Sequence, residues 1–299
     1  MSLSLDHQFS GHEGPINHIQ FSSDSRFLIS AGYDHTIRLW SEKEQKNISI
    51  LKGHLDSVNS FVLNDSNAKM ISGGSDNALC WWDVTSELLI KRVRCHDGAI
   101  NSVCMNNDNT VIVSGSFDSK VKIWDARDTN VRPIQVLMDA SDSITSVVTS
   151  RYEIFASSAD GTLRTYDIRN QSLTTDNINS RIVHLDISKD GVYLLLSTME
   201  SKTLMFSKSI GEVRQTFRGI HNSKYYVKSR FVGEDRGVLS GSDTGEAILW
   251  DINEATVKER VSFGEGPILD VASSLPFVSI ALASSNGKIG VFKKAKKVE

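Results

Sequence analysis

Cysteine is scarce in this chain of 299 residues, which contains only Cys80, Cys95 and Cys104. An odd count without a C-x-x-C spacing argues against a disulfide framework and against a zinc knuckle. It suits a reducing compartment, so we expect the protein in the nucleus, in the cytoplasm or in both. The N-terminal stretch MSLSLDHQF has no basic segment followed by an apolar run, so we expect no signal peptide.

Long apolar runs and a strong net charge are also missing. No stretch approaches the roughly 18 consecutive apolar residues that span a membrane, so we predict no membrane segment. The net charge of -3 gives no reason to expect nucleic-acid binding, and we predict no sequence-specific contact with nucleic acid. The one basic cluster is C-terminal, where it forms either a solvated tail or a localisation or partner signal: Lys288, Lys293, Lys294, Lys296 and Lys297.

Catalytic motifs are missing as well. The sequence has no glycine-rich phosphate loop, no H-E-x-x-H pattern and no separate pair of carboxylates. We therefore predict a protein that is not an enzyme and that uses no metal and no cofactor. Helical apolar periodicity is not evident either. Short β-branched runs separated by Ser, Gly, Asp and Asn are present instead, which is typical of antiparallel strands joined by turns.

These runs form seven repeats. Each repeat closes with an aromatic residue, and the spacings between successive ones are 42, 42, 42, 40, 44 and 42: Trp40, Trp82, Trp124, Tyr166, Phe206, Trp250 and Phe292. Units of this length with several strands, a Gly-His near the start and Trp-Asp at the end resemble the WD-repeat propeller. The sequence therefore predicts an all-β, seven-bladed WD40 β-propeller over residues 1–293, followed by a basic tail at 294–299.

The ends of the chain predict how the ring closes. The last repeat stops after its third strand, KIGVFK at 288–293, and so lacks an outer strand. Residues 3–9 precede the first Gly-His, where an outer strand belongs. We expect residues 3–9 to pair with the last blade, which removes exposed main-chain edges.

Ser, His and Asp recur together in a way that could suggest a hydrolase triad. Their offsets are the same in the first three repeats, and each set ends in a tryptophan: His12, Ser30, Asp34 and Trp40; His54, Ser72, Asp76 and Trp82; His96, Ser114, Asp118 and Trp124. A catalytic triad is needed once, whereas three copies favour a structural hydrogen-bond chain in each blade. A buried indole N–H needs an acceptor, and the Ser–His–Asp series supplies one. We expect repeats four, five and seven, which lack this set, to rely on apolar packing.

Partner-binding residues are predicted on the face that carries the tight turns. Tyr33 and Phe117 precede the turn Asp of their repeats, and aromatic side chains beside polar amides are suitable anchors for a protein or peptide. The alternative is that both residues merely cover the mouth of the channel. Other candidates lie at the start of the first strands and in the segment 218–230: Asn17, Asn59, Asn101, Lys228 and Tyr225.

Two repeats end in Trp/Tyr-Asp-x-Arg, with the arginines at positions Arg127 and Arg169. This pattern resembles the motif by which some propellers dock onto the adaptor of cullin ubiquitin ligases. It predicts adaptor docking through these two residues, with solvated strand-end charges as the alternative.

Three segments, NTVIVSGSFDSKVKIWDARD, YEIFASSADGTLRTYDIR and RGIHNSKYYVKSR, resemble the mitogen-activated protein kinase organizer family in their order and spacing. The resemblance implies a non-enzymatic scaffold associated with catalytic-stage spliceosomes, where a DEAH-box helicase is a neighbour. It also implies an alternative, the assembly of mitogen-activated protein kinase cascade components. A substrate receptor of a cullin ubiquitin ligase is a third hypothesis. In each case we expect protein partners in a multiprotein complex and a monomeric propeller.

Overall fold

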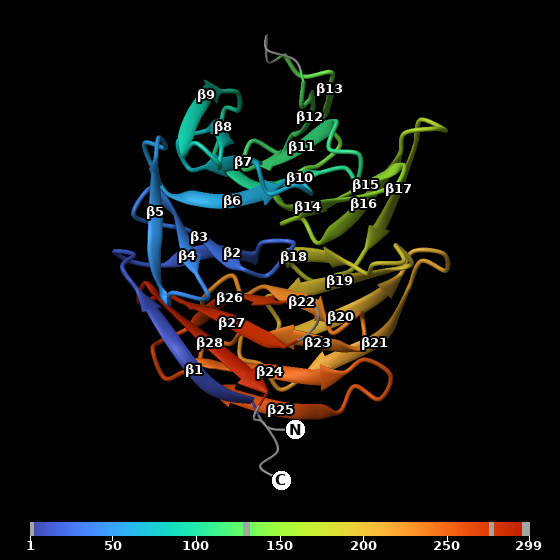
Figure 1. Ribbon diagram of the computed structural model, residues 1–299. Coiled ribbons are helices and arrows are strands. Elements are labelled where there is room, and N and C mark those ends of the chain that lie inside the picture. The colour runs from blue at the N-terminus through green and yellow to red at the C-terminus, as the bar shows by residue number, and fades with distance from the viewer. Residues whose placement is uncertain (1–2, 128–131, 275–277, 295–299) are drawn as a thin grey trace.

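The computed structural model describes residues 3–127, 132–274 and 278–294, and it contains 28 strands and no helix within them. The strands form seven sheets of four antiparallel strands each, arranged around a central channel (Figure 1). The structure thus confirms the predicted seven-bladed all-β propeller.

The blades follow chain order, and their strands run from the channel outward. Blade 1 contains β2 (Ile16–Phe21), β3 (Phe27–Gly32), β4 (Thr36–Ser41) and β5 (Lys46–Lys52). Blade 2 contains β6 (Val58–Leu63), β7 (Lys69–Gly74), β8 (Ala78–Asp83) and β9 (Leu88–Arg94). Blade 3 contains β10 (Ile100–Met105), β11 (Val111–Ser116), β12 (Val121–Asp125) and β13 (Gln135–Leu137). Blade 4 contains β14 (Ile144–Ser150), β15 (Glu153–Ser158), β16 (Thr162–Asp167) and β17 (Ser172–Asn177).

The remaining three blades complete the ring. Blade 5 contains β18 (Ile182–Ile187), β19 (Tyr193–Thr198), β20 (Lys202–Ser207) and β21 (Glu212–Arg218). Blade 6 contains β22 (Ser229–Val232), β23 (Gly237–Ser240), β24 (Glu246–Asp251) and β25 (Val257–Ser262). Blade 7 contains β26 (Ile268–Ser273), β27 (Ser279–Ser284), β28 (Lys288–Lys294) and, as its outer strand, β1 (Leu3–Ser10).

Blade 7 closes the ring with strands from both ends of the chain. β1 pairs antiparallel with β28, from Leu3 opposite Lys294 to Ser10 opposite Lys288. The two strands run side by side in Figure 1. The predicted closure by residues 3–9 is therefore confirmed, and each strand is one residue longer than expected. Lys294 belongs to β28, whereas the rest of the predicted basic tail, 295–299, lies outside the described residues.

The hydrophobic core lies between neighbouring blades. Trp40, for example, packs with Phe9 of the closing strand and Ile289 of blade 7 in one buried cluster. The closing aromatic side chains of all seven repeats are at most 9% exposed, because each packs against a neighbouring sheet. Burial of such large side chains contributes about 1.5–3 kcal/mol each, so the inter-blade core stabilises the ring as a whole.

The inner strands share a local irregularity. In every blade except blade 6, an extra residue interrupts the register between the first and second strands, as between Ile16 and His18. Such β-bulges turn a side chain out of the regular alternation. The residues that follow them occupy equivalent positions on the inner strands: His18, Ser60, Ser102, Ser146, His184 and Asp270.

Candidate protein-interaction surface

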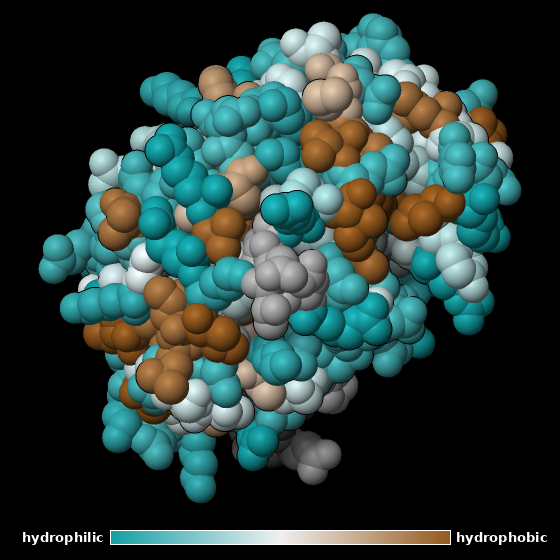
Figure 2. Space-filling model, turned by 90° about the horizontal axis from the view of Figure 1, so that it is seen from above, coloured by the Kyte–Doolittle hydropathy of each residue, from teal (hydrophilic) through white to brown (hydrophobic). Residues whose placement is uncertain are grey.

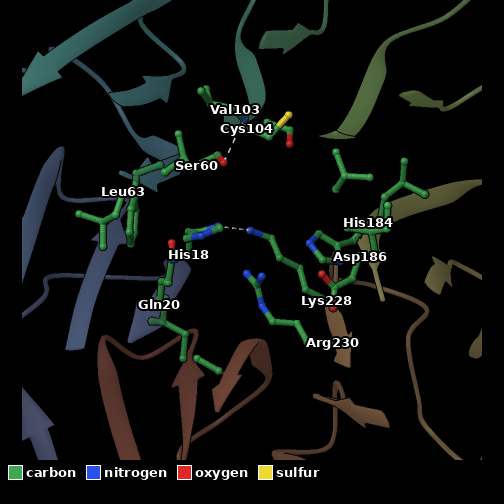
Figure 3. A pocket seen from close by; sticks show the side chains of 18 of the residues that line it. His18, Gln20, Ser60, Leu63, Val103, Cys104, His184, Asp186, Lys228 and Arg230 are labelled. Atoms are coloured by element: carbon green, nitrogen blue, oxygen red, sulfur yellow. Dashed lines mark hydrogen bonds between the residues drawn. The ribbon is translucent and has the colours of Figure 1, made fainter. Parts of the chain in front are cut away.

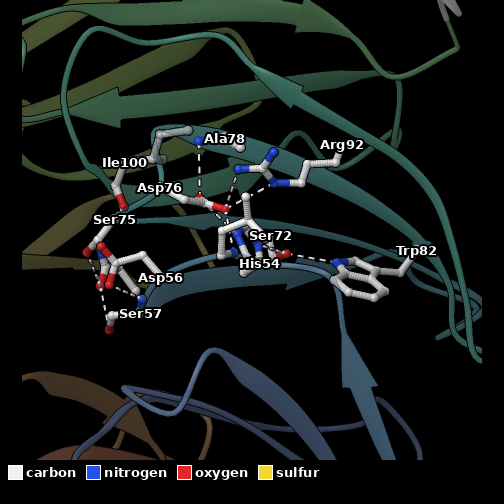
Figure 4. A network of polar contacts seen from close by, with 12 residues as sticks. His54, Asp56, Ser57, Ser72, Ser75, Asp76, Ala78, Trp82, Arg92 and Ile100 are labelled. Carbon is white, nitrogen blue, oxygen red and sulfur yellow. Dashed lines mark hydrogen bonds and ion pairs between the residues drawn. The ribbon is translucent and has the colours of Figure 1, made fainter.

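The Ser, His, Asp and Trp residues of blades 1 to 3 meet in three nearly identical hydrogen-bond chains. In blade 2, which Figure 4 shows, His54 lies between Asp76 and Ser72, with Nδ1 3.0 Å from Asp76 Oδ1 and Nε2 2.7 Å from Ser72 Oγ. Trp82 Nε1 donates to the same serine oxygen at 2.8 Å. The corresponding distances are 2.8, 2.7 and 2.8 Å in blade 1 and 2.8, 2.9 and 2.9 Å in blade 3.

Burial and neighbouring charges affect the pKa of two members of these hydrogen-bond chains, Asp76 and His96. Burial alone would raise the pKa of Asp76, but bonds from His54, Leu55 and Arg92 hold it well below its ordinary value, so Asp76 is a carboxylate. In blade 3, burial lowers the pKa of His96 more than Asp118 raises it. A neutral imidazole with its proton on Nδ1 donates to the Asp and accepts the serine O–H at Nε2, which leaves the serine oxygen for the indole N–H.

This arrangement serves structure rather than catalysis. The three serines, Ser30, Ser72 and Ser114, are 0% exposed, and each already accepts a tryptophan N–H. A serine nucleophile must reach its substrate, and a buried hydroxyl in this position has no route to one. The chains instead tie the loop before each inner strand to the second and third strands of the blade.

The other blades replace the chain in different ways. Blade 4 has Ala156 at the serine position, and the Tyr166 hydroxyl donates to Asp139 at 3.1 Å. Blades 5 and 7 carry Leu196 with Phe206 and Leu282 with Phe292, which pack in apolar clusters as expected.

Blade 6 contains His221, Ser240 and Trp250 but does not form the hydrogen-bond chain. Its Trp250 Nε1 donates to the Arg218 carbonyl at 3.2 Å instead of to Ser240, and His221 is exposed. The turn after Ser240 has one extra residue, so Asp243 does not stand at the position that the Asp has in blades 1 to 3.

The face that carries the tight turns and the loops entering the inner strands is named here the rim face. In all seven blades the residue before the turn donates its backbone N–H to a carbonyl of the entering loop, as Tyr33 does to Pro15 and Phe117 to Ala99, both at 2.8 Å. The turn residue two positions later has a left-handed φ in every blade, including 65° at His35 and 64° at Ser119. The rim turns are therefore repeated, well-braced positions.

Tyr33 and Phe117 differ from the other residues at their turn position. Their side chains are 59% and 65% exposed, whereas the five equivalents, Ser75, Ala159, Met199, Asp243 and Ser285, are half-buried. Leu55, in the loop entering blade 2, is 70% exposed on the same face. The sequence did not single out Leu55, because an isolated Leu after Gly-His has no distinctive pattern.

Asn17, Asn59 and Asn101 are the extra residues of the bulges in blades 1 to 3. Each side-chain amide donates to a backbone carbonyl of the next inner strand: Asn17 to Val58 at 3.0 Å, Asn59 to Ile100 at 3.0 Å and Asn101 to Ile144 at 2.7 Å. The inner strand is an edge, and its carbonyls need donors. Although these residues were predicted as partner contacts, their amides connect neighbouring blades.

Tyr225 and Lys228 are close in sequence, but their side chains lie in different environments. Tyr225 is 41% exposed at the rim. Its neighbour Tyr226 receives a 2.7 Å hydrogen bond from Arg181, whose guanidinium also lies 5.5 Å from the centre of the Tyr226 ring. Lys228 instead points into the channel, where its Nζ donates to the Asn17 carbonyl at 2.7 Å.

The channel contains a cluster of charged and partly or fully buried side chains that the sequence did not reveal. Figure 3 shows Lys228 reaching His18, with Arg230, His184 and Asp186 beside it. These residues line a cavity of about 550 Å³. Asp270 is 0% exposed and accepts hydrogen bonds from Arg230 at 3.1 and 3.3 Å. Burial lowers the pKa of Lys228 to about 8 and raises that of Asp186 to about 6.

Arg127 and Arg169 lie at turns between third and outer strands, away from the rim face. Each guanidinium forms an ion pair with the Asp two residues earlier, Arg127 with Asp125 at 3.0 Å and Arg169 with Asp167 at 2.9 Å. Arg169 also stacks over Tyr152 at 4.7 Å. Both side chains remain more than half exposed, and adaptor docking through them stays a prediction.

Metal-binding clusters and membrane-spanning helices are absent from the described residues. These residues contain no group of three or more His, Cys, Asp and Glu side chains that could hold a metal ion. No helix among them is long and apolar enough to cross a membrane.

Comparison with known proteins places the chain in a family. The family model described as WD domain, G-beta repeat matches residues 3–41, 45–83 and 88–125, the repeats that end in the complete hydrogen-bond chains. WD repeat domain-containing protein 83 of Xenopus tropicalis is 38% identical over 291 residues, which is 97% of this chain and 92% of that protein. The chain belongs to the WD repeat domain-containing protein 83 family.

Other relatives match over shorter stretches. A WD repeat-containing protein of Schizosaccharomyces pombe is 31% identical over 168 residues, which is 56% of this chain and 57% of that protein. WD repeat domain-containing protein 83 of Homo sapiens is 33% identical over 140 residues, 47% of this chain and 44% of that protein. The chain thus spans about half the length of the Schizosaccharomyces pombe and Homo sapiens relatives. WD repeat proteins serve as scaffolds for protein interactions, and the propeller fold described above is typical of non-enzymatic proteins.

Proposed function

We propose that this member of the family assembles a nuclear pre-mRNA splicing complex, next to a DEAH-box helicase, and binds its partners through the rim face. Partner binding at this face is supported by the exposure of Tyr33 and Phe117, which stand on turns held by backbone hydrogen bonds. The equivalent residues of the other blades are half-buried. Large aromatic side chains are the residues that protein interfaces use most often as anchors. The placement in a splicing complex is supported by the sequence resemblance to the mitogen-activated protein kinase organizer family.

The test is affinity purification of the tagged full chain from separated nuclear and cytoplasmic extracts, followed by mass spectrometry. We expect splicing factors, including a DEAH-box helicase, in the nuclear fraction. Kinase-cascade components in the cytoplasmic fraction would replace this proposal by the kinase scaffold. A cullin adaptor, lost on Arg127→Ala and Arg169→Ala, would replace it by the ubiquitin-ligase receptor.

The double variant Tyr33→Ala/Phe117→Ala tests the surface in the same experiment. We expect it to lose partners that the wild-type chain retains, because both anchors are removed. Leu88→Ala is the matched control, since Leu88 is 61% exposed on the outer strand β9, away from the rim. Retention of every partner by the double variant would contradict the choice of the rim face.

A further inference from the structure

The rim face of blades 1 to 3 exposes three large apolar side chains on a fixed backbone. Besides Tyr33 and Phe117, whose amides are bonded to the entering loops, Leu55 donates its backbone N–H to Asp76 at 2.9 Å. Their exposure of 59 to 70% therefore belongs to braced turns and loops. Covering one such side chain with a partner removes apolar surface from water and is worth about 1.5–3 kcal/mol.

Acidic residues surround these apolar side chains. The rim loops of blades 1 to 4 contain nine Asp or Glu residues and a single Lys or Arg, Lys120; they are 11–15, 33–35, 53–57, 75–77, 95–99, 117–120, 138–143 and 159–161. We name these loops the acidic rim. The rim loops of blades 5 to 7 have no such imbalance, since they contain three acids and three bases; they are 178–181, 199–201, 219–228, 241–245, 264–267 and 285–287.

Part of this negative charge is already neutralised within the blades. Asp34, Asp76 and Asp160 form ion pairs with arginines of their own blades, Arg38, Arg92 and Arg164, at 3.3, 2.9 and 3.0 Å.

Four other carboxylates of the acidic rim are open to solvent. Glu13, Asp56, Asp97 and Asp142 are all exposed. Among the described residues only Asp97 has a cationic partner, Lys120 at 3.0 Å, and Asp97 remains 79% exposed. Glu13 and Asp97 each follow a histidine that belongs to one of the hydrogen-bond chains. The backbone N–H of Glu13 donates to Asp34 at 3.2 Å, and that of Asp97 donates to Asp118 at 3.0 Å. The loops that carry Glu13 and Asp97 are thus fixed by the hydrogen-bond chains beneath them.

We propose that the acidic rim binds a segment of a partner protein in which Lys or Arg residues stand beside large apolar side chains. This inference rests on the proposed function and specifies the partner's chemistry. The apolar groups supply affinity at Tyr33, Leu55 and Phe117, while the carboxylates attract cationic segments and disfavour acidic ones. The sign of the charge also excludes a nucleic-acid backbone as the occupant of this surface.

The first experiment pans a phage-displayed library of random dodecapeptides against the full chain at low salt. We expect the enriched peptides to combine Lys or Arg with Leu, Phe, Trp or Tyr. Enrichment of acidic peptides, or of none, would overturn the proposal.

The second experiment measures binding of one enriched, fluorescein-labelled peptide by fluorescence anisotropy. We expect Tyr33→Ala/Phe117→Ala to weaken binding at least about tenfold, since each lost anchor costs more than about 1 kcal/mol. The charge variant Glu13→Gln/Asp56→Asn/Asp97→Asn should weaken it several-fold and reduce its salt dependence.

The controls are Leu88→Ala and Asp108→Asn, which change an exposed apolar and an exposed acidic residue away from the rim. Thermal melting checks that every variant is folded. Equal weakening by the controls and by the rim variants would also refute the proposal.

The two proposals fail separately. If the purification loses partners with Tyr33→Ala/Phe117→Ala but no basic apolar peptide is enriched, the rim binds proteins of another chemistry. If basic apolar peptides bind the rim but no splicing factor copurifies, the surface is correct and the assigned complex is wrong.

Discussion

Asp270 of blade 7 accepts a hydrogen bond from the backbone N–H of Ile19 in blade 1, with an Oδ2 to N distance of 3.0 Å. The same carboxylate binds Arg230 of blade 6 and lies 3.7 Å from Lys228. One buried group therefore joins three blades next to the seam where the chain closes the ring. Ser60 and Ser102 have the same relation to the following blades, since their hydroxyls accept the N–H groups of Val103 and Val147 at 3.2 and 3.1 Å.

The charge of Asp270 is predicted to be essential for stability. Asp270→Asn keeps the size of the side chain but leaves the partly buried Arg230 and Lys228 without their counter-charge. Removal of one partner of a buried ion pair costs about 3–5 kcal/mol. We expect a loss of this size in the free energy of unfolding, measured by urea denaturation followed by circular dichroism. Asp108→Asn, at an exposed site, is the control, and an unchanged midpoint for Asp270→Asn would contradict the role of the cluster.

The closing strand gives a prediction with an internal control. Phe9 is 2% exposed and lies 5.1 Å from Trp40 between ring centres, whereas Leu5 on the same strand is 51% exposed. Phe9→Ala should lower stability by about 3–5 kcal/mol because it leaves a cavity at the seam, and Leu5→Ala should change it little. Calorimetric melting of both variants tests this. Deletion of residues 1–9 should lower the melting temperature further, and a melting temperature equal to that of the full chain would refute the closure.

The hydrogen-bond chain of blade 2 is predicted to act as a unit. Ser72→Ala leaves Trp82 Nε1 and His54 Nε2 without their partner, at a cost of about 1–3 kcal/mol for each buried group. Ser262→Ala, at an exposed position of β25, is the control. Adding Trp82→Phe removes the orphaned N–H, so the double variant should lose less stability than the two single variants together. Strict additivity in chemical denaturation would show that the chain is not coupled.

Asp186 predicts a dependence of stability on pH. Burial raises its pKa from 3.8 to about 6 in the folded chain. Between these values the unfolded chain has lost a proton that the folded chain keeps, so the contribution of this group to stability falls as pH rises from about 4 to 6 and is constant above that.

Asp186→Asn removes this titration while an amide oxygen can still accept the N–H of Phe231. The difference in free energy of unfolding between variant and wild type should therefore change with pH. It should shift by about 2 kcal/mol in favour of the variant when the pH is raised from 4 to 7.5, since one pKa unit corresponds to about 1.4 kcal/mol. Urea denaturation at both pH values measures the difference. A parallel pH profile for the two proteins would mean that Asp186 titrates normally.

Some features of this protein follow from the sequence by itself. The regular spacing of the closing aromatics, from Trp40 to Phe292, determined the number of blades, because each repeat must bury the same side chain against its neighbour. The missing outer strand of the last repeat determined how residues 3–9 close the ring. The fixed offsets between His, Ser, Asp and Trp likewise determined the hydrogen-bond chains, since a repeated spacing within a repeated fold gives a repeated geometry.

Only the tertiary structure decided how residues from different blades meet. Asn17, Lys228 and Asp270 have unremarkable sequence neighbours, yet they meet at the channel from three blades, because Lys228 contacts the Asn17 carbonyl and lies near the Asp270 carboxylate. The amides of Asn17, Asn59 and Asn101, which the sequence suggested for partner contacts, bind the next blade instead. The difference in exposure between Phe117 and its equivalents is likewise set by packing around the ring. Spacing along the chain specifies contacts within a blade, whereas contacts between blades and across the channel depend on ring closure, which brings together residues more than 200 positions apart.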